Sequence, residues 1–418
     1  MRHEQLIGDS MPENRVDNTD KHLLDEHSDV SKPHSGKIRK CVENLSQNPG
    51  AEIVRYGRRK ANILSLGQGE GDAATPDFIL KGAQKAMDDG RTFYGPVLGQ
   101  DPLRQEISNY YDRIYDLHVP TNRVFVTSSG TTAMHLALTA ILDAGDEVVA
   151  VTPIWKNLLG AIELAQAKFT EVALDNNEGA WSLDLDKLFD ACNKDTRAIL
   201  ITTPSNPTGW VMSREEIKAV MEFARERDIW VIADEVYSRL VYGNSHAPSF
   251  LEFAQDDDRL FTVNSFSKAW AMTGWRLGWL TGPSRVEDAV RDIALYDNMG
   301  PPTFTQYGGI EALRHGEDFI AQQMQLWERN RARVQEFFES TGRIDATESE
   351  ATFYSFFKID GEDNCLEFAK RLIDDVSLSL APGCAFGKVG QGYMRLCYAV
   401  SEARLDDALD RLDRALKS

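Results

Sequence analysis

The amino-acid sequence predicts an α/β fold: a large doubly wound domain with a mixed, mostly parallel sheet, and a smaller α+β domain. Two observations favour this class. Between about residues 123 and 285, short apolar segments bounded by turns alternate with amphipathic helical segments, a pattern typical of strands joined by helices that cover both faces of a sheet. After about residue 285 the alternation stops, and helices mix with short strands. That change indicates a second domain.

Buried strands are expected in the first region at 123–127, 147–152, 197–203, 229–233, 260–264 and 277–281. A small-residue loop, 128–132, follows the first strand and leads into a helix at 133–142. Ser213 and Glu216 have the spacing of a capping box, which predicts the start of a helix that runs to Arg227.

Upstream of these strands, helices are expected at 78–87 and 103–115. Asp101 and Pro102 suit the N-cap and the first helical position of the second helix. The elements expected after residue 285 are helices at 286–298, 319–337, 366–374 and 402–416 and strands at 351–359 and 393–398.

These patterns divide the chain into four parts. A polar N-terminal arm has few periodic apolar residues and is expected to be flexible. The other three parts are an N-terminal contribution to the small domain with its linker, the large domain, and the C-terminal remainder of the small domain. The predicted boundaries are 1–36, 37–74, 75–313 and 314–418.

Composition excludes several classes of function. The net charge of −19 argues against a broad surface for nucleic acid or anionic membranes, and no apolar run is long enough to span a bilayer. The N-terminus lacks the plan of a secretory signal, so the cytoplasm is the expected location. Five scattered cysteines without CxxC or CxxH spacing suit a reducing compartment, and no metal site is expected.

Lys268 is the central candidate for chemistry. It follows the apolar strand segment 260–264 and two hydroxyl residues, Ser265 and Ser267, in aromatic surroundings. Burying an ammonium group is costly unless the amine is paired or neutral, and a neutral lysine is a nucleophile toward carbonyl groups. The alternative is a surface lysine whose stem lies along its aromatic neighbours.

Other polar groups also follow predicted strands, where ligands collect in doubly wound sheets. Asp234 ends an apolar run, and Arg276 lies eight positions after Lys268. Ser129, Gly130 and Thr131 lie between a strand and a helix, which suits an anion at the helix N-terminus. Taken singly, each has an ordinary structural alternative. Asp234 could be an N-cap, Arg276 could form a surface ion pair, and residues 129–131 could be a helix-capping turn.

Together they meet the requirements of pyridoxal phosphate. This cofactor needs a lysine for its aldehyde, a carboxylate for its ring nitrogen, an aromatic side chain against the ring, and backbone N–H groups with an arginine for its phosphate. Trp155, which follows another strand, is a candidate for the aromatic position, although a core role is its alternative.

The chain resembles the fold-type I pyridoxal phosphate enzymes, class I/II aminotransferases, and is most similar to their aspartate aminotransferase subgroup. The resemblance covers about residues 37–418. It rests on Ser-Asn-Pro-Thr-Gly at 205–209, Asp-Glu-Val-Tyr at 234–237, Ser-x-Ser-Lys at 265–268, Met-Thr-Gly-Trp-Arg at 272–276 and Tyr-Met-Arg-Leu at 393–396.

The resemblance implies an enzyme that exchanges amino and keto groups between an L-amino acid and a 2-oxo acid, and it implies roles by position. Lys268 would hold the cofactor as a Schiff base and move the substrate proton. Asp234 would pair with the ring nitrogen, and Trp155 would stack on the ring. The other implied ligands are Tyr237 and Asn206 for the phenolic oxygen; Ser129, Gly130, Thr131, Ser265 and Arg276 for the phosphate; and Arg395, Asn206 and Gly69 for the substrate carboxylate.

Tyr94 reaches the phosphate of the neighbouring subunit's cofactor in this family, so the resemblance also implies a homodimer with shared active sites. Thr131 stands where some aspartate-specific relatives carry a lysine. Lys156 is a candidate replacement, and a solvent-facing lysine is its alternative. The apolar loop 299–304 could form a substrate pocket or pack a domain junction. A neutral or broad substrate range is therefore expected.

Two other functions are alternatives to transamination. A C–S lyase or another carbanion reaction would use the same fold and cofactor, because the pocket decides the outcome. A regulator that joins an aminotransferase-like domain to a DNA-binding module is disfavoured, because the N-terminal extension is short and acidic.

Overall fold

The computed structural model describes residues 38–177 and 179–417. The chain divides into two compact units at Asn44 and Leu45. The described part of the first unit carries the short helix α1 (Lys40–Glu43). The arm expected at 1–36 lies outside the described residues. Everything below concerns the unit that begins at Leu45.

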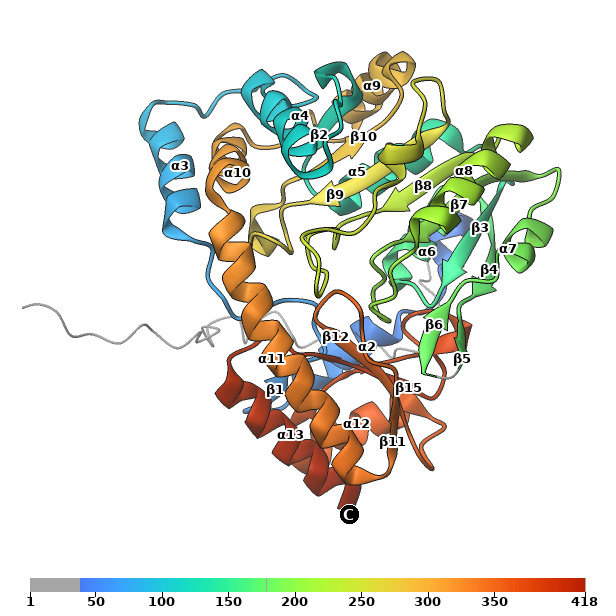
Figure 1. Ribbon diagram of the computed structural model, residues 1–418, viewed down its shortest axis with the longest axis vertical. Coiled ribbons are helices and arrows are strands. Elements are labelled where there is room, and N and C mark those ends of the chain that lie inside the picture. Colours follow the sequence, from blue (N-terminus) through green and yellow to red (C-terminus); the bar gives the residue numbers. More distant parts are fainter. Residues whose placement is uncertain (1–37, 178, 418) are drawn as a thin grey trace, which may run out of the picture. The chain divides into compact units, whose positions relative to one another are not determined.

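The larger sheet has seven strands in the order β2-β10-β9-β8-β7-β3-β4 (Figure 1). Strand β10 is antiparallel to both of its neighbours, and the other pairs are parallel. The predicted mixed, mostly parallel sheet is thus confirmed. The strands are β2 (Val124–Thr127), β3 (Glu147–Thr152), β4 (Lys168–Ala173), β7 (Thr196–Thr202), β8 (Trp230–Asp234), β9 (Leu260–Ser265) and β10 (Gly278–Thr281).

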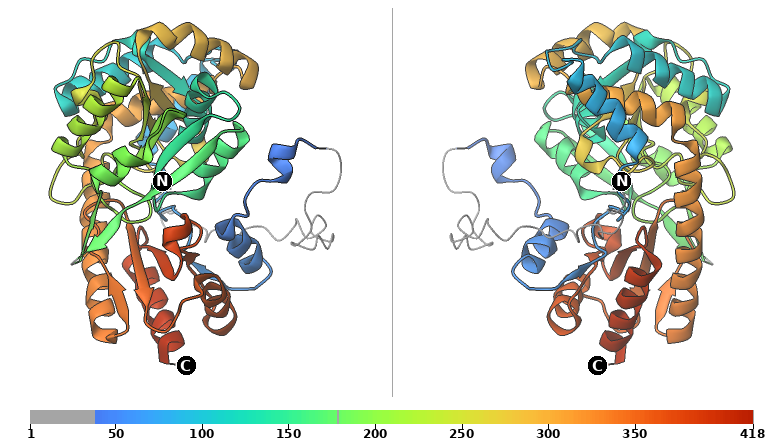
Figure 2. Two further views of the ribbon diagram at one scale, coloured as in Figure 1. Left: turned by 90° about the vertical axis from the view of Figure 1, so that its right-hand side faces the viewer. Right: turned by 90° about the vertical axis from the view of Figure 1, so that its left-hand side faces the viewer.

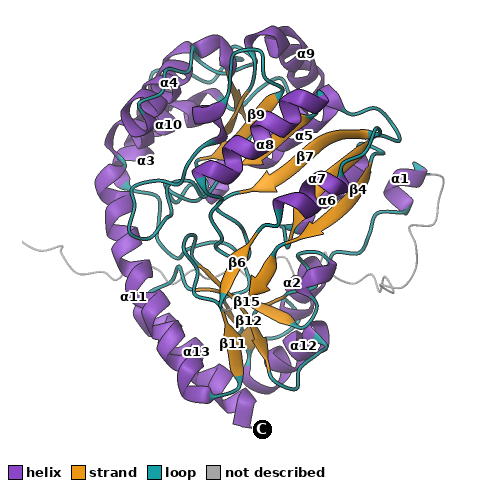
Figure 3. Ribbon diagram, turned by 45° about the vertical axis from the view of Figure 1, so that its right-hand side comes forward, coloured by secondary structure: helices purple, strands orange, loops and turns teal. Residues whose placement is uncertain are grey.

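Alternate residues of the buried strands face two separate cores. In β7, for example, Ala198 and Leu200 join one core, and Ile199 and Ile201 join the other. Figure 3 shows the strands lying among helices. The first core includes α5 (Gly130–Ile141), α6 (Lys156–Leu164) and α9 (Glu287–Asp297); the second includes α4 (Asp101–Tyr115), α8 (Arg214–Arg227) and α10 (Thr303–His315).

The smaller sheet is antiparallel, in the order β11-β12-β15-β14. The helix α2 (Pro49–Gly57) lies early in the chain and packs against α12 and β14, which lie near the end of the chain (Figure 2). This arrangement explains how an N-terminal segment contributes to a mainly C-terminal domain. Its elements are β11 (Ile344–Ala346), β12 (Tyr354–Ile359), β14 (Ala381–Pro382), β15 (Tyr393–Cys397), α11 (Glu317–Thr341), α12 (Cys365–Val376) and α13 (Glu402–Lys417).

Three details differ from the sequence prediction. Edge strand β4 and the hairpin of β5 (Asp175–Asn177) and β6 (Ala180–Ser182) were not predicted. Asp101 is the first residue of α4 and not its N-cap, which is Gln100.

The predicted capping box of Ser213 and Glu216 is present. The remaining elements are α3 (Asp77–Asp88), α7 (Leu185–Ala191), a parallel pair of β1 (Leu64–Ser65) with β13 (Leu378–Ser379), and short 3-10 turns.

None of the helices in the described ranges combines the length and apolar character that crossing a bilayer requires. The four predicted domain boundaries are not tested by these observations and stay a prediction.

Candidate active site

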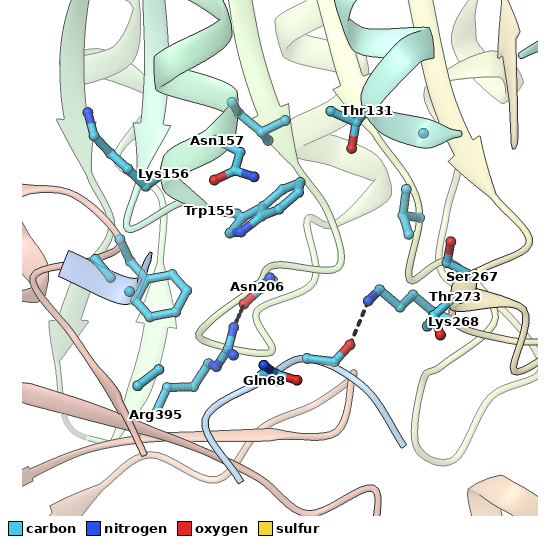
Figure 4. A pocket seen from close by; sticks show the side chains of 18 of the residues that line it. Gln68, Thr131, Trp155, Lys156, Asn157, Asn206, Ser267, Lys268, Thr273 and Arg395 are labelled. Carbon is cyan, nitrogen blue, oxygen red and sulfur yellow. Dashed lines mark hydrogen bonds between the residues drawn. The ribbon is translucent and has the colours of Figure 1, made fainter. Parts of the chain in front are cut away.

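A cavity of about 580 Å³ lies between the ends of the large-sheet strands and the small sheet. Lys268 and Arg395 enter it from opposite sides, with Trp155 and Asn206 between them (Figure 4). Residues that follow β2, β3, β7, β8 and β9 supply one wall, whereas α2, the 67–69 loop and the small sheet supply the other. Segments far apart in the sequence therefore meet at the strand ends, where ligands bind in sheets of this type.

Lys268 lies three residues beyond the end of β9, in a turn organised by hydroxyl groups. Ser265 Oγ accepts a hydrogen bond from Ser267 N at 3.1 Å and donates one to Ser267 Oγ at 2.8 Å. Lys268 Nζ donates to Gly69 O at 2.6 Å and has no ion-pair partner in the described part of the chain. Burial lowers the pKa of Lys268 to about 8, so a neutral amine is accessible near neutral pH.

Asp234 is the last residue of β8, and 7% of its surface is exposed. Burial raises the pKa of Asp234 to about 6, and the backbone N–H of Val236, at 3.3 Å from Oδ1, opposes that shift. No lysine or arginine side chain in the described ranges forms an ion pair with it. A buried carboxylate in this position would be stabilised by a cationic N–H donor inside the cavity, which a pyridinium ring provides.

Tyr237 lies one turn beyond Asp234 and is joined to the opposite wall. Its Oη is 2.8 Å from Tyr354 Oη and accepts a long hydrogen bond, 3.4 Å, from Asn206 Nδ2. Burial raises the pKa of Tyr237 well above its ordinary value, so this hydroxyl remains protonated and can act as a hydrogen-bond donor.

The N-terminus of α5 opens onto the cavity at Gly130 and Thr131. Ser129 caps the helix, because its Oγ accepts a hydrogen bond from Thr132 N at 3.0 Å. A Cβ at Gly278 of β10 would lie 2.7 Å from Gly130 N, so glycine is required for the close approach of strand and helix. Arg276 also lines the cavity. Free N–H groups beside a guanidinium favour a phosphate here.

Arg395, on β15, is 4% exposed and held between aromatic rings. Its Cζ lies 4.2 Å from the centre of the Tyr354 ring and 4.8 Å from that of Phe386. Nη1 donates to Asn206 Oδ1 at 2.7 Å, and Nη2 donates to Gly67 O at 2.6 Å. Two parallel donors in a fixed orientation suit a carboxylate.

Most of the sequence-predicted residues meet in this cavity. Those that line it are Gly69, Gly130, Thr131, Trp155, Asn206, Asp234, Tyr237, Ser265, Lys268, Arg276 and Arg395. Ser129 is not part of the lining and acts on it only through the helix that it caps. Tyr94 is also outside the lining and is 86% exposed.

The sequence reasoning did not single out Tyr354, Phe386 or Gln68, which also line the cavity. In the sequence, Tyr354 and Phe386 resemble ordinary core residues, and no local signal marks them as part of a binding site. The loop 299–304 contributes nothing to the lining. It packs instead on the 93–97 loop, where Thr303 Oγ1 donates to Phe93 O at 2.8 Å.

Lys156, proposed as a cation for a second carboxylate, lines the cavity but already has partners. Its Nζ donates to Ser46 Oγ at 2.5 Å and lies 3.9 Å from Glu163. Arg55 and Arg58 of the α2 segment line the same cavity. Within the described ranges, neither of these guanidinium groups has a hydrogen bond or an ion pair.

Comparison with known proteins identifies the family. Residues 61–412 match the family described as aminotransferase class I and II. An aspartate aminotransferase of Pyrococcus horikoshii is 32% identical over 369 residues, 88% of this chain and 94% of that protein. An aromatic-amino-acid aminotransferase of Thermococcus litoralis is 32% identical over 359 residues, 85% of this chain and 92% of that protein. The solved structure of N-succinyldiaminopimelate aminotransferase from Mycobacterium tuberculosis has a TM-score of 0.85 at 27% identity, covering 90% of this chain and all of that one.

The fold and these matches define a fold-type I enzyme, and the chain belongs to the class I and II aminotransferases, with aspartate aminotransferase-like relatives. It is a transaminase that uses pyridoxal phosphate to exchange amino and keto groups between an amino acid and a 2-oxo acid.

Proposed function

We propose that the cavity holds the cofactor with its aldehyde carbon at Lys268, its ring nitrogen at Asp234 and its phosphate at the N-terminus of α5. One observation carries the proposal: a buried amine and a buried carboxylate line the same cavity, and neither has an ion-pair partner within the described residues. Gly130 supports it further, because a Cβ there would approach Ser265 Cβ to 3.2 Å and narrow the proposed phosphate site.

When bound, pyridoxal phosphate would supply an electron sink for the electron pair left on the substrate Cα once that carbon loses its proton. Lys268 Nζ takes this proton and later returns it, a general base and acid role that suits its lowered pKa. Asp234 stays ionised because a positive N–H donor stabilises its charge. Tyr237 and Asn206 would donate to the phenolic oxygen of the cofactor, and Trp155 would cover its ring.

Arg395 binds the substrate α-carboxylate with Asn206 and the backbone at Gly69. The substrate side chain then faces the wall that carries Arg55 and Arg58. Because both guanidinium groups lack partners in the described ranges, we propose a broad substrate range that includes acidic side chains. Replacing both residues with alanine should raise KM for aspartate and glutamate and leave KM for leucine unchanged.

We further propose a cytoplasmic homodimer with shared active sites. Large apolar side chains are exposed on the 93–97 loop and at the end of α9 with the residues that follow it: Phe93 (82%), Tyr94 (86%), Leu295 (40%), Tyr296 (87%) and Met299 (45%). A patch of this kind favours association. A second copy of the chain would cover this patch, and Tyr94 would then reach the phosphate in the partner's site.

Lys268→Ala tests the central assignment. Turnover should fall by at least about 10³-fold, since both the covalent anchor and the proton carrier are lost, and the visible absorbance of the lysine-bound cofactor should disappear. The matched control is Lys194→Ala, at a lysine whose side chain is 85% exposed. Near-normal turnover in Lys268→Ala would refute the assignment.

A single-turnover experiment tests the outcome of the reaction. The wild-type enzyme, loaded with cofactor and given an amino acid alone, should release one 2-oxo acid per active site and no ammonia. Continued release of ammonia would instead indicate an eliminating lyase.

A further inference from the structure

Two of the five free cysteines lie together in the small domain, outside the proposed catalytic set. Cys365 is the first residue of α12 and is 1% exposed. Cys384 follows strand β14 and is partly exposed. Nineteen positions separate them in the sequence, so only the folded chain brings them together.

The two residues are in direct contact. The backbone N–H of Cys384 donates to Cys365 Sγ at 3.4 Å. Standard bond lengths then place Cys384 Cβ within roughly 6 Å of that sulfur. A disulfide requires the Cβ carbons to lie roughly 4 Å apart, so rotation of the Cys384 side chain with a small backbone shift would close the bond.

The surroundings favour a thiolate on Cys365 and a thiol on Cys384. A hydrogen bond from the Cys384 thiol, with backbone N–H groups of the 383–384 and 392 segments, lowers the pKa of Cys365 although burial raises it. The same interaction and burial raise the pKa of Cys384. The N-terminus of α12 adds a favourable field for the anion. These contacts favour Cys365 as the sulfur that is oxidised first and Cys384 as the sulfur that follows; Cys365 Sγ also lies 3.8 Å from Gln391 Oε1.

The segment that follows Cys384 forms part of the active-site wall. Ala385 and Phe386 line the cavity, and the Phe386 ring centre lies 4.8 Å from Arg395 Cζ. Phe386 O also accepts a hydrogen bond from Ile154 N at 2.8 Å, next to Trp155. A shift of the backbone at residue 384 would move the aromatic ring that holds Arg395.

We propose that Cys365 and Cys384 are a redox-active pair, a covalent modification site at which hydrogen peroxide forms a disulfide that weakens substrate binding at Arg395. The Cys365 thiolate attacks peroxide, an S–O bond forms as the O–O bond breaks, and the departing hydroxide takes up a proton as water. Cys384 sulfur then attacks the sulfenic sulfur and releases a second water. The two sulfurs are oxidised and peroxide is reduced, and a dithiol reductant reverses the change.

The test uses the cofactor-loaded full chain treated with stoichiometric peroxide. A peptide pair joined through Cys365 and Cys384 should appear by mass spectrometry, and two of the five thiols should be lost. KM for the amino acid should rise several-fold, with recovery after dithiothreitol. The Cys384→Ser variant should keep normal KM under peroxide and accumulate a sulfenic acid on Cys365 that dimedone traps.

The matched control is Cys192→Ser, which removes another buried thiol and should still form the bond. Cys365→Ser provides a second means of removing the pair, should Cys384→Ser fail to fold. Absence of the joined peptide, at a peroxide dose that already oxidises Cys41, would overturn the proposal. A disulfide that forms without changing KM would overturn its connection to Arg395.

Discussion

Lys268 and Asp234 show how burial sets the chemistry of single residues in this enzyme. Both groups are removed from water without an ion-pair partner in the described ranges, and burial therefore shifts each pKa toward the neutral form, to about 8 for the lysine and about 6 for the aspartate. In the cofactor-free protein these unpaired groups are a cost to stability. Under the proposed assignment, the bound cofactor would remove that cost by reacting with one group and pairing with the other.

The pH dependence of stability should expose this cost. Folded Lys268 loses its proton near pH 8, whereas an unfolded lysine does so near 10.5. Between these values the unfolded state binds more protons, so the free energy of unfolding rises with pH, by about 3 kcal/mol in total. Lys268→Met should lack this rise in denaturant titrations of the cofactor-free protein from pH 7.5 to 10.5. If the free energies of unfolding of Lys268→Met and the wild type changed with pH in parallel, this expectation would be wrong. Lys81→Met is the control at a surface lysine.

Arg395→Lys should separate substrate binding from cofactor binding. A lysine cannot supply two parallel donors or stack between Tyr354 and Phe386 as a guanidinium does. We expect kcat/KM for amino and oxo acids to fall by roughly 10²-fold, with cofactor absorbance unchanged. Arg371→Lys, on the surface of the same domain, should behave as wild type. Equal losses in both variants would argue against a clamp at position 395.

Among the secondary-structure elements, β10 and the start of α5 approach each other closely beside the site. Gly278→Ala would place a Cβ 2.7 Å from Gly130 N and from Asn264 O. Overpacking of this kind costs about 1–3 kcal/mol, and displacement of the start of α5 should also raise the Kd of the cofactor. Gly160→Ala is the control, because no atom lies within 4 Å of its added Cβ. Thermal unfolding and cofactor titration of both variants measure the two effects.

Elements with strong local signals could be predicted from the sequence, and weaker ones could not. Strands β7, β8 and β9 are mainly apolar because nearly all of their residues are buried, and their motifs mark where they end. Strand β4 is at the sheet edge, with lysine and glutamate among partly buried positions, so its pattern is diluted. Hairpin β5–β6 is short and polar.

The residues of the candidate site were likewise predictable only where the local sequence carries a strong signal. Residues on one wall were predictable because each belongs to a motif at the end of a strand. Tyr354 and Phe386 were not, because their role depends on where the folded chain places their rings relative to Arg395. That arrangement is set by tertiary contacts, and the local sequence of an aromatic strand does not encode it.

For the whole molecule, a shared active site gives a sharp test of the proposed dimer. Lys268→Ala and Tyr94→Ala homodimers should each have low activity. If Tyr94 acts across the interface, unfolding and refolding the two variants together forms hybrids in which one site has both residues intact. Activity should then rise well above the sum of the separately refolded variants. A simple sum, or a monomer by light scattering, would contradict the shared site.

Helix α11 connects the region of the large sheet with the small sheet. Its first residue, Glu317, pairs through both carboxylate oxygens with Arg239 beside the large sheet. Farther along, Asn330 Nδ2 donates to Tyr398 O and Val400 O, at 2.9 and 2.7 Å, just past the strand that carries Arg395. The helix is therefore a connection of fixed length and phase between Arg239 beside the large sheet and the segment that follows the strand carrying Arg395. One inserted residue between Glu317 and Asn330 would turn the far end by about 100°, so this stretch should tolerate substitutions far better than changes of length.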